Sequence, residues 1–227
     1  MLENRPNAII CDMDGLLVDS ERMEWRVWRE AAVEHGIELT DEHFISFIGH
    51  SADEGERLLR QYYGAEFDVS GFRASCRTRM RALMDAEGVS LRPGAREWIE
   101  FVTALDIPVA VATSSGPVHA RERLGDLWPR FATVVTRADV ARGKPFPDLY
   151  LEAAARMNVR PDACLALEDS PTGARAALAA GMPVLIVPDL VTPPDELVAL
   201  AAGVYDSLHA VRDAAHRAWN GSEGSSG

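Results

Sequence analysis

The sequence predicts an α/β protein whose sheet is interrupted, after its first strand, by a group of helices. From Gly88 onward, short apolar runs alternate with segments of helical periodicity, which is typical of a parallel sheet with helical crossovers. Before that point, residues 19–87 show helical spacing alone. We therefore expect an α/β core of residues 1–18 and 88–219 and an inserted helical domain of residues 19–87.

The first predicted strand, residues 8–11, has no polar side chain, which suits a strand buried on both faces. Asp12 and Asp14 follow it, and because side chains two apart on extended backbone point the same way, we expect their carboxylates to converge. Two carboxylates about 4 Å apart repel by about 4 kcal/mol at an effective dielectric constant near 20, so the pair is expected to hold a cation or a shared proton. Mg²⁺ fits such oxygen ligands. The alternative is that Asp-x-Asp-Gly is only a turn.

The apolar spacing within residues 19–87 predicts four amphipathic helices, which together make a small bundle. We expect the first helix to be capped by Ser20 and to stop at Gly36, and the second to open at Thr40. Residues 51–54 form a capping-box pattern for the third helix, and residues 72–84 mark the apolar face of the fourth.

The core continues with four further predicted strands separated by helices. The polar, Gly/Ser-rich end of the chain, residues 220–227, is predicted to be disordered. The strands are expected at residues 108–112, 131–136, 164–167 and 183–187.

Composition narrows the functional class. The chain has 227 residues, of which 47% are hydrophobic, enough for one ordinary core and a second smaller one. No apolar run approaches the ~20 residues of a membrane span, and the N-terminal sequence does not resemble a secretory signal. The three cysteines are an odd, widely spaced set typical of reduced core residues, and the net charge of −12 argues against a nucleic-acid surface. We expect a cytoplasmic monomer that binds neither nucleic acid nor membranes.

Lys144 is the only lysine among 23 basic residues. It lies in the segment GKPFPD, between residues that restrict the backbone. A compact ammonium on a flexible stem can do what a planar guanidinium cannot, so a functional role is favoured over chance survival on the surface.

Polar residues also follow two other predicted strands. Residues 113–115, Thr-Ser-Ser, precede a helix whose first turn holds Pro117, which indicates an anion site, although Ser115 alone could be a helix cap. Glu168 and Asp169 follow the strand at residues 164–167. Ligands of open α/β sheets bind at the carboxyl ends of the strands, where all these groups are expected to lie.

In this order, the segments DMDGLLVDSE, VATSS, GKPFPD and LEDSPTG resemble the four motifs of the haloacid dehalogenase-like (HAD) superfamily of magnesium-dependent phosphohydrolases. The resemblance covers residues 8–188. It is strongest to members with a helical cap after the first strand, which include phosphosugar phosphatases and the beta-phosphoglucomutase branch. It implies a Rossmann-like, five-stranded parallel sheet of order 5-4-1-2-3 with an inserted four-helix cap, and it places Asp12 and Asp169 on neighbouring strands.

The resemblance also implies roles for the motif residues. Asp12 would attack phosphorus and form an aspartyl-phosphate, and Asp14 would act as general acid and then general base. The phosphoryl oxygens would be held by Thr113, Ser114 and Lys144. The implied ligands of Mg²⁺ are Asp12, the Asp14 carbonyl, Glu168 and Asp169.

The substrate is expected to be a small phosphorylated sugar or polyol, selected by the cap residues Glu24, His50 and Ser51. A sugar-phosphate mutase is the first alternative. Members of that branch use a cap histidine and a cap arginine at positions that hold Glu24 and Ala52 here, which favours a hydrolase. The second alternative is a regulatory module that accepts phosphate without turnover, but such a module has no use for a four-helix cap.

Overall fold

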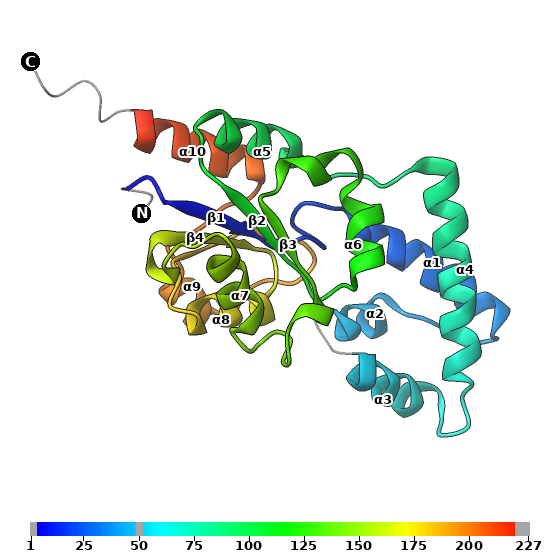
Figure 1. Cartoon of the computed structure of the whole chain (residues 1–227). Helices are drawn as coiled ribbons and strands as arrows, with labels where there is room; N and C mark the ends of the chain where they lie inside the picture. The colour runs from blue at the N-terminus through cyan, green and yellow to red at the C-terminus, as the bar shows by residue number, and fades with distance from the viewer. Residues whose placement is uncertain (1–3, 49–51, 221–227) are drawn as a thin grey trace, which may run out of the picture. The chain divides into compact units, whose positions relative to one another are not determined.

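The computed structural model describes residues 4–48 and 52–220. The chain forms two compact units, shown as one ribbon in Figure 1. The first unit comprises Met1–Val18 and Leu91–Gly227, and the second comprises Asp19–Ser90.

The first unit is built on a parallel sheet of six strands in the order β3-β2-β1-β4-β5-β6. This confirms the α/β class and the expected order of five strands, with Asp12 and Asp169 following the neighbouring strands β1 and β4. β6 is an addition at the β5 edge, and its two residues are too few to produce a periodic signal. The strands are β1 (Ala8–Cys11), β2 (Val109–Ala112), β3 (Thr133–Val135), β4 (Cys164–Glu168), β5 (Val184–Ile186) and β6 (Gly203–Val204).

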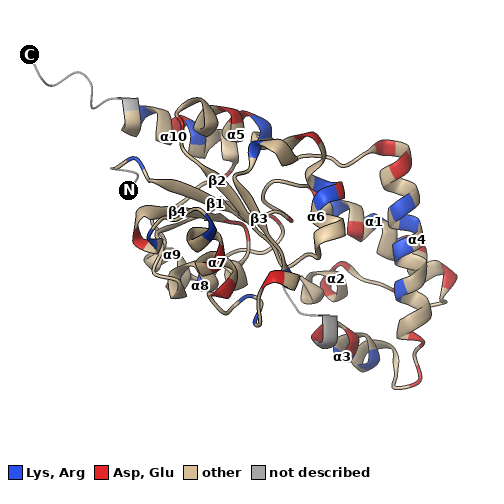
Figure 2. Ribbon diagram, in the orientation of Figure 1, with Lys and Arg blue, Asp and Glu red and all other residues tan. Residues whose placement is uncertain are grey.

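Helices cover both faces of this sheet (Figure 1). Alternate strand residues such as Ile10 and Ala110 share a buried apolar cluster with Ala153 of α7 and Ala177 of α8. α5 and α10 pack together through a stack of Phe101 on Trp219, and the ribbons of β1 and β2 carry no charged residue (Figure 2). The helices are α5 (Ala95–Ala104), α6 (Pro117–Leu124), α7 (Asp148–Arg156), α8 (Pro171–Ala179), α9 (Asp195–Leu200) and α10 (Leu208–Asn220), with short 3₁₀ turns η1 (Gly125–Arg130), η2 (Arg137–Asp139) and η3 (Pro161–Ala163).

The second unit contains four helices around an aromatic core. Trp28 packs edge-on against Phe72 with ring centroids 5.4 Å apart. Thr40 caps its helix by accepting a hydrogen bond from the His43 N–H at 3.1 Å, as expected, whereas Ser20 is the first residue of a helix and not its cap. The helices are α1 (Ser20–Glu34), α2 (Asp41–Phe47), α3 (Ala52–Tyr63) and α4 (Val69–Glu87).

Charged residues of the second unit pair across its helices. Several blue bands mark arginines along α4 in Figure 2. Arg79 of α4 contacts Glu34 of α1 at 2.8 Å, and both side chains are partly exposed. The predicted capping box at residues 51–54 falls partly outside the described residues.

The chain leaves the first unit after Val18 and returns to it at Leu91, and these two connecting segments lie side by side. Val18 and Leu91 form an antiparallel bridge. The Asp19 N–H donates to the Ser90 carbonyl, and the Arg92 N–H donates to the Leu17 carbonyl, both at 2.9 Å. Arg92 also forms an ion pair of 2.6 Å with Asp189, whose side chain is 1% exposed, so the returning passage is tied to the segment after β5.

Within the described ranges, the helices are too short or too polar to cross a membrane. Cys11, Cys76 and Cys164 are free thiols.

Candidate active site

Asp12 is delivered to the carboxyl edge of the sheet by β1. All four residues of β1 are fully buried, because strands lie on both sides of it and helices cover its faces. The Asp12 N–H donates to the Leu167 carbonyl at 2.9 Å, so pairing with β4 continues one residue past the strand. The backbone of Asp12 is therefore held at the edge of the sheet, and the residue is 6% exposed.

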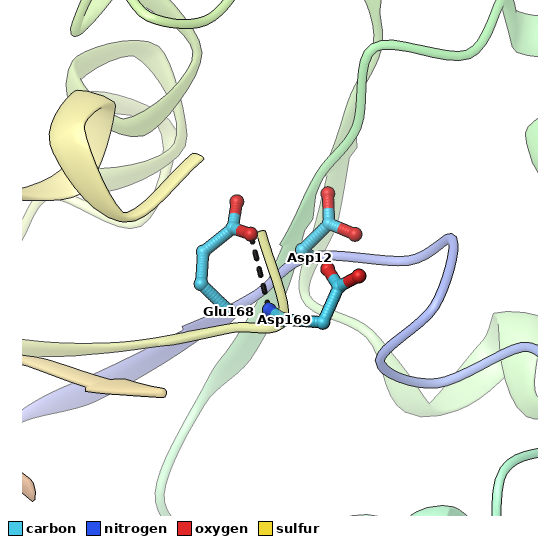
Figure 3. Close-up of side chains that lie close together, drawn as sticks. All are labelled: Asp12, Glu168 and Asp169. Atoms are coloured by element: carbon cyan, nitrogen blue, oxygen red, sulfur yellow. Dashed lines mark hydrogen bonds between the residues drawn. The ribbon is translucent and has the colours of Figure 1, made fainter. Parts of the chain in front are cut away.

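Two further carboxylates come from the end of β4. Glu168 is the last residue of that strand and is fully buried, and Asp169 is 4% exposed. One carboxylate oxygen from each of Asp12, Glu168 and Asp169 lies within 4.8 Å of the others. Figure 3 shows the three side chains at the ends of β1 and β4, with Glu168 accepting a hydrogen bond from the Asp169 N–H at 3.2 Å.

Lys144 lies in the loop before α7 and joins two of these carboxylates. Its Nζ donates to Asp12 Oδ1 and to Glu168 Oε1, and its side chain is 7% exposed. The Tyr150 hydroxyl of α7 donates to the same Glu168 oxygen at 2.6 Å. The other Glu168 oxygen accepts bonds from Ser170, so the Glu168 carboxylate is held on both sides.

The electrostatics of this cluster reflect an excess of negative charge. Burial raises the pKa of Asp12 well above its usual range, the neighbouring Glu168 raises it further, and Lys144 opposes both effects. Burial disfavours the charged form of Lys144, but the carboxylates of Asp12 and Glu168 outweigh it and raise the pKa of the ammonium. Both shifts are expected where carboxylates outnumber the ammonium that two of them share.

The donor set fits a hard divalent cation. Three buried carboxylates offer the oxygen ligands that such ions prefer, and a divalent ion would offset the excess charge. Two glycines leave the room that the carboxylates occupy. A Cβ at Gly15, whose φ is +85°, would overlap the Asp169 carboxylate, and a Cβ at Gly173 would overlap that of Glu168. The backbone is therefore shaped around these acidic side chains.

Asp14 has different partners. Its Oδ2 accepts a hydrogen bond from Ser115 Oγ at 2.7 Å and a longer one from Thr113 Oγ1 at 3.4 Å, and its Oδ1 is paired with Arg123 of α6. Asp14 thus has partners of its own beyond the end of β1, while its negative charge still contributes to the raised pKa of Asp12. Ser115 is not a helix cap either: Gly116 occupies the cap position of α6, and Pro117 opens the helix as expected.

The remaining predicted residues lie in several places. Thr113 is buried at the end of β2, and its Oγ1 accepts a hydrogen bond from the Ser115 N–H at 3.0 Å. Ser114 beside it is exposed. Glu24 lies on α1 in the second unit, and His50 and Ser51 lie outside the described residues.

Sequence reasoning overlooked the contacts of Tyr150 and Arg123. The Tyr150 hydroxyl reaches Glu168 from the side of α7 that faces the sheet. Arg123 is one of 22 arginines, so its residue type gives no signal. Ala120 and Leu124 are four residues apart and both buried, which indicates that this side of α6 faces inward.

Comparison with known proteins places this geometry in context. Residues 6–181 match the family model described as haloacid dehalogenase-like hydrolase. The chain is 33% identical over 177 residues to "Phosphorylated carbohydrates phosphatase" of Thermotoga maritima, covering 77% of this chain and 82% of that protein. It is 33% identical over 185 residues to "Hexitol phosphatase A" of Escherichia coli K12, covering 81% and 83%.

A solved structure is similar over nearly the whole chain. It is a HAD family hydrolase from Deinococcus radiodurans R1 with bound phosphate and sodium, and it superposes with a TM-score of 0.77 at 32% identity. The match covers 93% of this chain and 96% of that one.

Proposed function

The chain belongs to the haloacid dehalogenase-like hydrolase family, and from that premise we propose that it is a magnesium-dependent phosphatase acting on a small sugar or polyol phosphate. The observation that carries this proposal is the buried cluster of Asp12, Glu168 and Asp169, with Lys144 bridging two of its carboxylates. A nucleophilic carboxylate, a fixed ammonium and a cation site at one sheet edge are the parts that phosphoryl transfer needs. The names of the similar phosphatases support the same class.

In the first step, an Asp12 carboxylate oxygen forms a bond to phosphorus. The bond from phosphorus to the substrate oxygen breaks, and that oxygen keeps the electron pair and takes a proton from Asp14. The products are an aspartyl-phosphate and the free alcohol. Asp12 suits the role of nucleophile because its position is fixed by β1 and by Lys144.

In the second step, water attacks phosphorus and transfers a proton to Asp14. The bond from phosphorus to the Asp12 oxygen breaks, which restores the Asp12 carboxylate and releases phosphate. Asp14 suits the role of acid and base because its side chain is 26% exposed, so that solvent reaches it, whereas Asp12 is buried.

Binding of the anionic phosphoryl group requires positive charge. Lys144 and the Thr113 hydroxyl hold phosphoryl oxygens, with Ser114 next to them on the same loop. Asp12, the Asp14 carbonyl, Glu168 and Asp169 would hold Mg²⁺, which would supply the charge neutralisation that lets a phosphate approach several carboxylates.

The second unit is assigned the role of a cap that limits the entry of water and selects the substrate. Within it, Glu24, His50 and Ser51 are the residues assigned to substrate choice. A monomer in the cytoplasm completes the proposal, and the free thiols are compatible with a reducing compartment.

A hydrolase is favoured over a sugar-phosphate mutase. The positions at which the mutase branch has a cap histidine and a cap arginine hold Glu24 and Ala52, so the cap lacks those two groups for a second phosphate. Two of the similar proteins named above carry the name phosphatase.

The decisive experiment measures phosphate release from a panel of sugar, polyol and aryl phosphates, with Mg²⁺ and with a chelator. Release that requires Mg²⁺ is expected for at least one small phosphomonoester. Phosphorus NMR of glucose 1-phosphate with catalytic bisphosphate should then show free phosphate or no product. Formation of glucose 6-phosphate as fast as phosphate release would reject the hydrolase, and no release from any substrate would reject the enzyme.

A further inference from the structure

We propose that Arg123 is a positioning residue that holds the Asp14 carboxylate in place for proton transfer to the leaving group. The inference rests on the proposed function, because it assigns a task to Arg123 within that reaction. It is carried by the contacts of Asp14, which come from two segments that adjoin β2.

The first observation is the ion pair between Arg123 and Asp14. Arg123 Nη1 contacts Asp14 Oδ1, and the Arg123 side chain is only 12% exposed. Burying a guanidinium is costly unless it is paired, and here the carboxylate provides the pairing. The chain therefore keeps a largely buried cation in contact with the proposed acid.

The second observation is that the other Asp14 oxygen is held as well. Ser115 Oγ donates to Asp14 Oδ2 at 2.7 Å, and Thr113 Oγ1 lies 3.4 Å from the same atom. One carboxylate oxygen thus meets the loop after β2, and the other meets α6. Donors on both oxygens fix the rotation of the carboxylate as well as its position.

The third observation is that Arg123 lies on α6 beside buried residues. Ala120 and Leu124 are buried, and Arg123 is three residues from the first and next to the second. Arg121, two residues earlier, is exposed and its guanidinium lies over the Trp128 ring at 4.8 Å. The same short helix therefore carries one arginine at Asp14 and another away from it, which provides a matched control.

Positioning of Asp14 has a specific kinetic consequence. A sugar or polyol oxygen leaves as a poor anion and needs the proton that Asp14 supplies, whereas nitrophenolate leaves without a proton. Loss of Arg123 should therefore slow the first phosphoryl transfer from an alkyl phosphate much more than that from p-nitrophenyl phosphate. A merely structural defect would slow both equally.

The test measures single-turnover rate constants of the parent, Arg123→Met and Arg121→Met with two substrates. These are p-nitrophenyl phosphate and the sugar or polyol phosphate that the parent hydrolyses fastest. General acid catalysis is worth 10²- to 10⁴-fold, so Arg123→Met should lower the alkyl rate by about tenfold to a hundredfold and the aryl rate by less than about threefold. KM should change little, because Lys144 and Thr113 hold the phosphoryl group. Arg121→Met should leave the ratio of the two rates unchanged.

Two further variants strengthen the test. Arg123→Lys keeps a cation on a flexible stem and should recover part of the alkyl rate, and it also serves if Arg123→Met does not fold. In an Asp14→Asn background, Arg123→Met should add less than about twofold, because residues that act as a unit are not additive.

The outcomes separate the two proposals. A parent that releases no phosphate from either substrate would overturn the proposed function. An active parent in which Arg123→Met slows both substrates equally, or slows neither, would overturn the role of Arg123 and leave the proposed function standing.

Discussion

Asp12 and Asp14 are two residues apart in the sequence, but their carboxylates lie in opposite surroundings. Asp12 is buried among Glu168 and Asp169, where negative charge is in excess and Lys144 opposes it. Asp14 is partly exposed and meets a guanidinium and two hydroxyl groups. Pairing with β4 continues to Asp12, whereas the chain turns at Gly15, so the two carboxylates have different partners.

The comparison shows how one short motif can supply two chemical roles. A nucleophile must be fixed and kept from water, and an acid or base must reach the substrate oxygen and exchange its proton. Here the surroundings, and not the residue type, separate the roles, as in other enzymes that use paired carboxylates. The following predictions alter one side of the comparison at a time.

The largest effect is expected for Asp12→Asn. An amide is nearly isosteric but neither attacks phosphorus nor ligates a metal well, so phosphate release should fall by about a thousandfold or more. Thermal unfolding without metal should occur at the same or a higher temperature, because one of three crowded acidic groups has been removed. Near-normal turnover, or a large loss of stability, would contradict this account of the Asp12 side.

Lys144→Arg should have the next largest effect. A planar guanidinium cannot occupy the space of an ammonium that contacts both Asp12 and Glu168, so kcat should fall by at least about tenfold, or about 1.4 kcal/mol of barrier. The matched control is Arg142→Lys in the same loop, since Arg142 is 56% exposed and pairs with Asp148 away from the cluster. Equal kinetics for both variants would assign Lys144 to packing alone.

Gly173→Ala tests the space that the cluster requires. The added Cβ would overlap the Glu168 carboxylate and push it from Lys144 and Tyr150, which should weaken Mg²⁺ binding by about tenfold to a hundredfold. Gly116→Ala is the control at the start of another helix, because a Cβ there meets no atom within 4 Å. Calorimetric titration with Mg²⁺ measures both, and equal affinities would show that Glu168 is not a ligand.

The smallest effect is expected at Asp139, which resembles Asp14 in its partners but lies in η2. Arg156 and Thr136 hydrogen bond to it and lower its pKa from 3.8 to about 2. Asp139→Asn should cost about 1 kcal/mol of unfolding free energy at pH 7 and leave turnover unchanged.

The pH dependence of that cost has a defined sign. A depressed pKa in the folded state means that the stabilisation is complete above the unfolded value near 4 and disappears as the pH falls to about 2. Chemical denaturation of parent and variant between pH 7 and pH 2 should therefore show converging stabilities. A difference that grows toward low pH would contradict the assignment.

Much of the fold follows from local sequence. Buried parallel strands have nearly continuous apolar sequences, and polar residues directly after them predict the functional edge of the sheet, here Asp12, Thr113 and Asp169. Lys144 stood out because the chain has no other lysine. These signals need no knowledge of the tertiary structure.

The contacts that define the surroundings of each carboxylate could not be obtained in this way. Arg123 lies 109 positions from Asp14, so no local spacing connects them. The hydroxyl of Tyr150 contacts Glu168 only because α7 packs on the sheet. β6 has two residues and exists because β5 offers an edge to pair with. Long-range packing decides such features, and a single sequence does not encode them in any local pattern.

The paired connecting segments at Leu17–Asp19 and Ser90–Arg92 have a consequence for the evolution of this chain. Because the insert leaves and returns through neighbouring hydrogen-bonded residues, closing the core chain across it requires no more than a tight turn would. Insertions are tolerated best where both ends already lie together. The insert is thus an exchangeable module: one of different length or sequence could replace it while the Arg92–Asp189 pair and the sheet edge remain as they are.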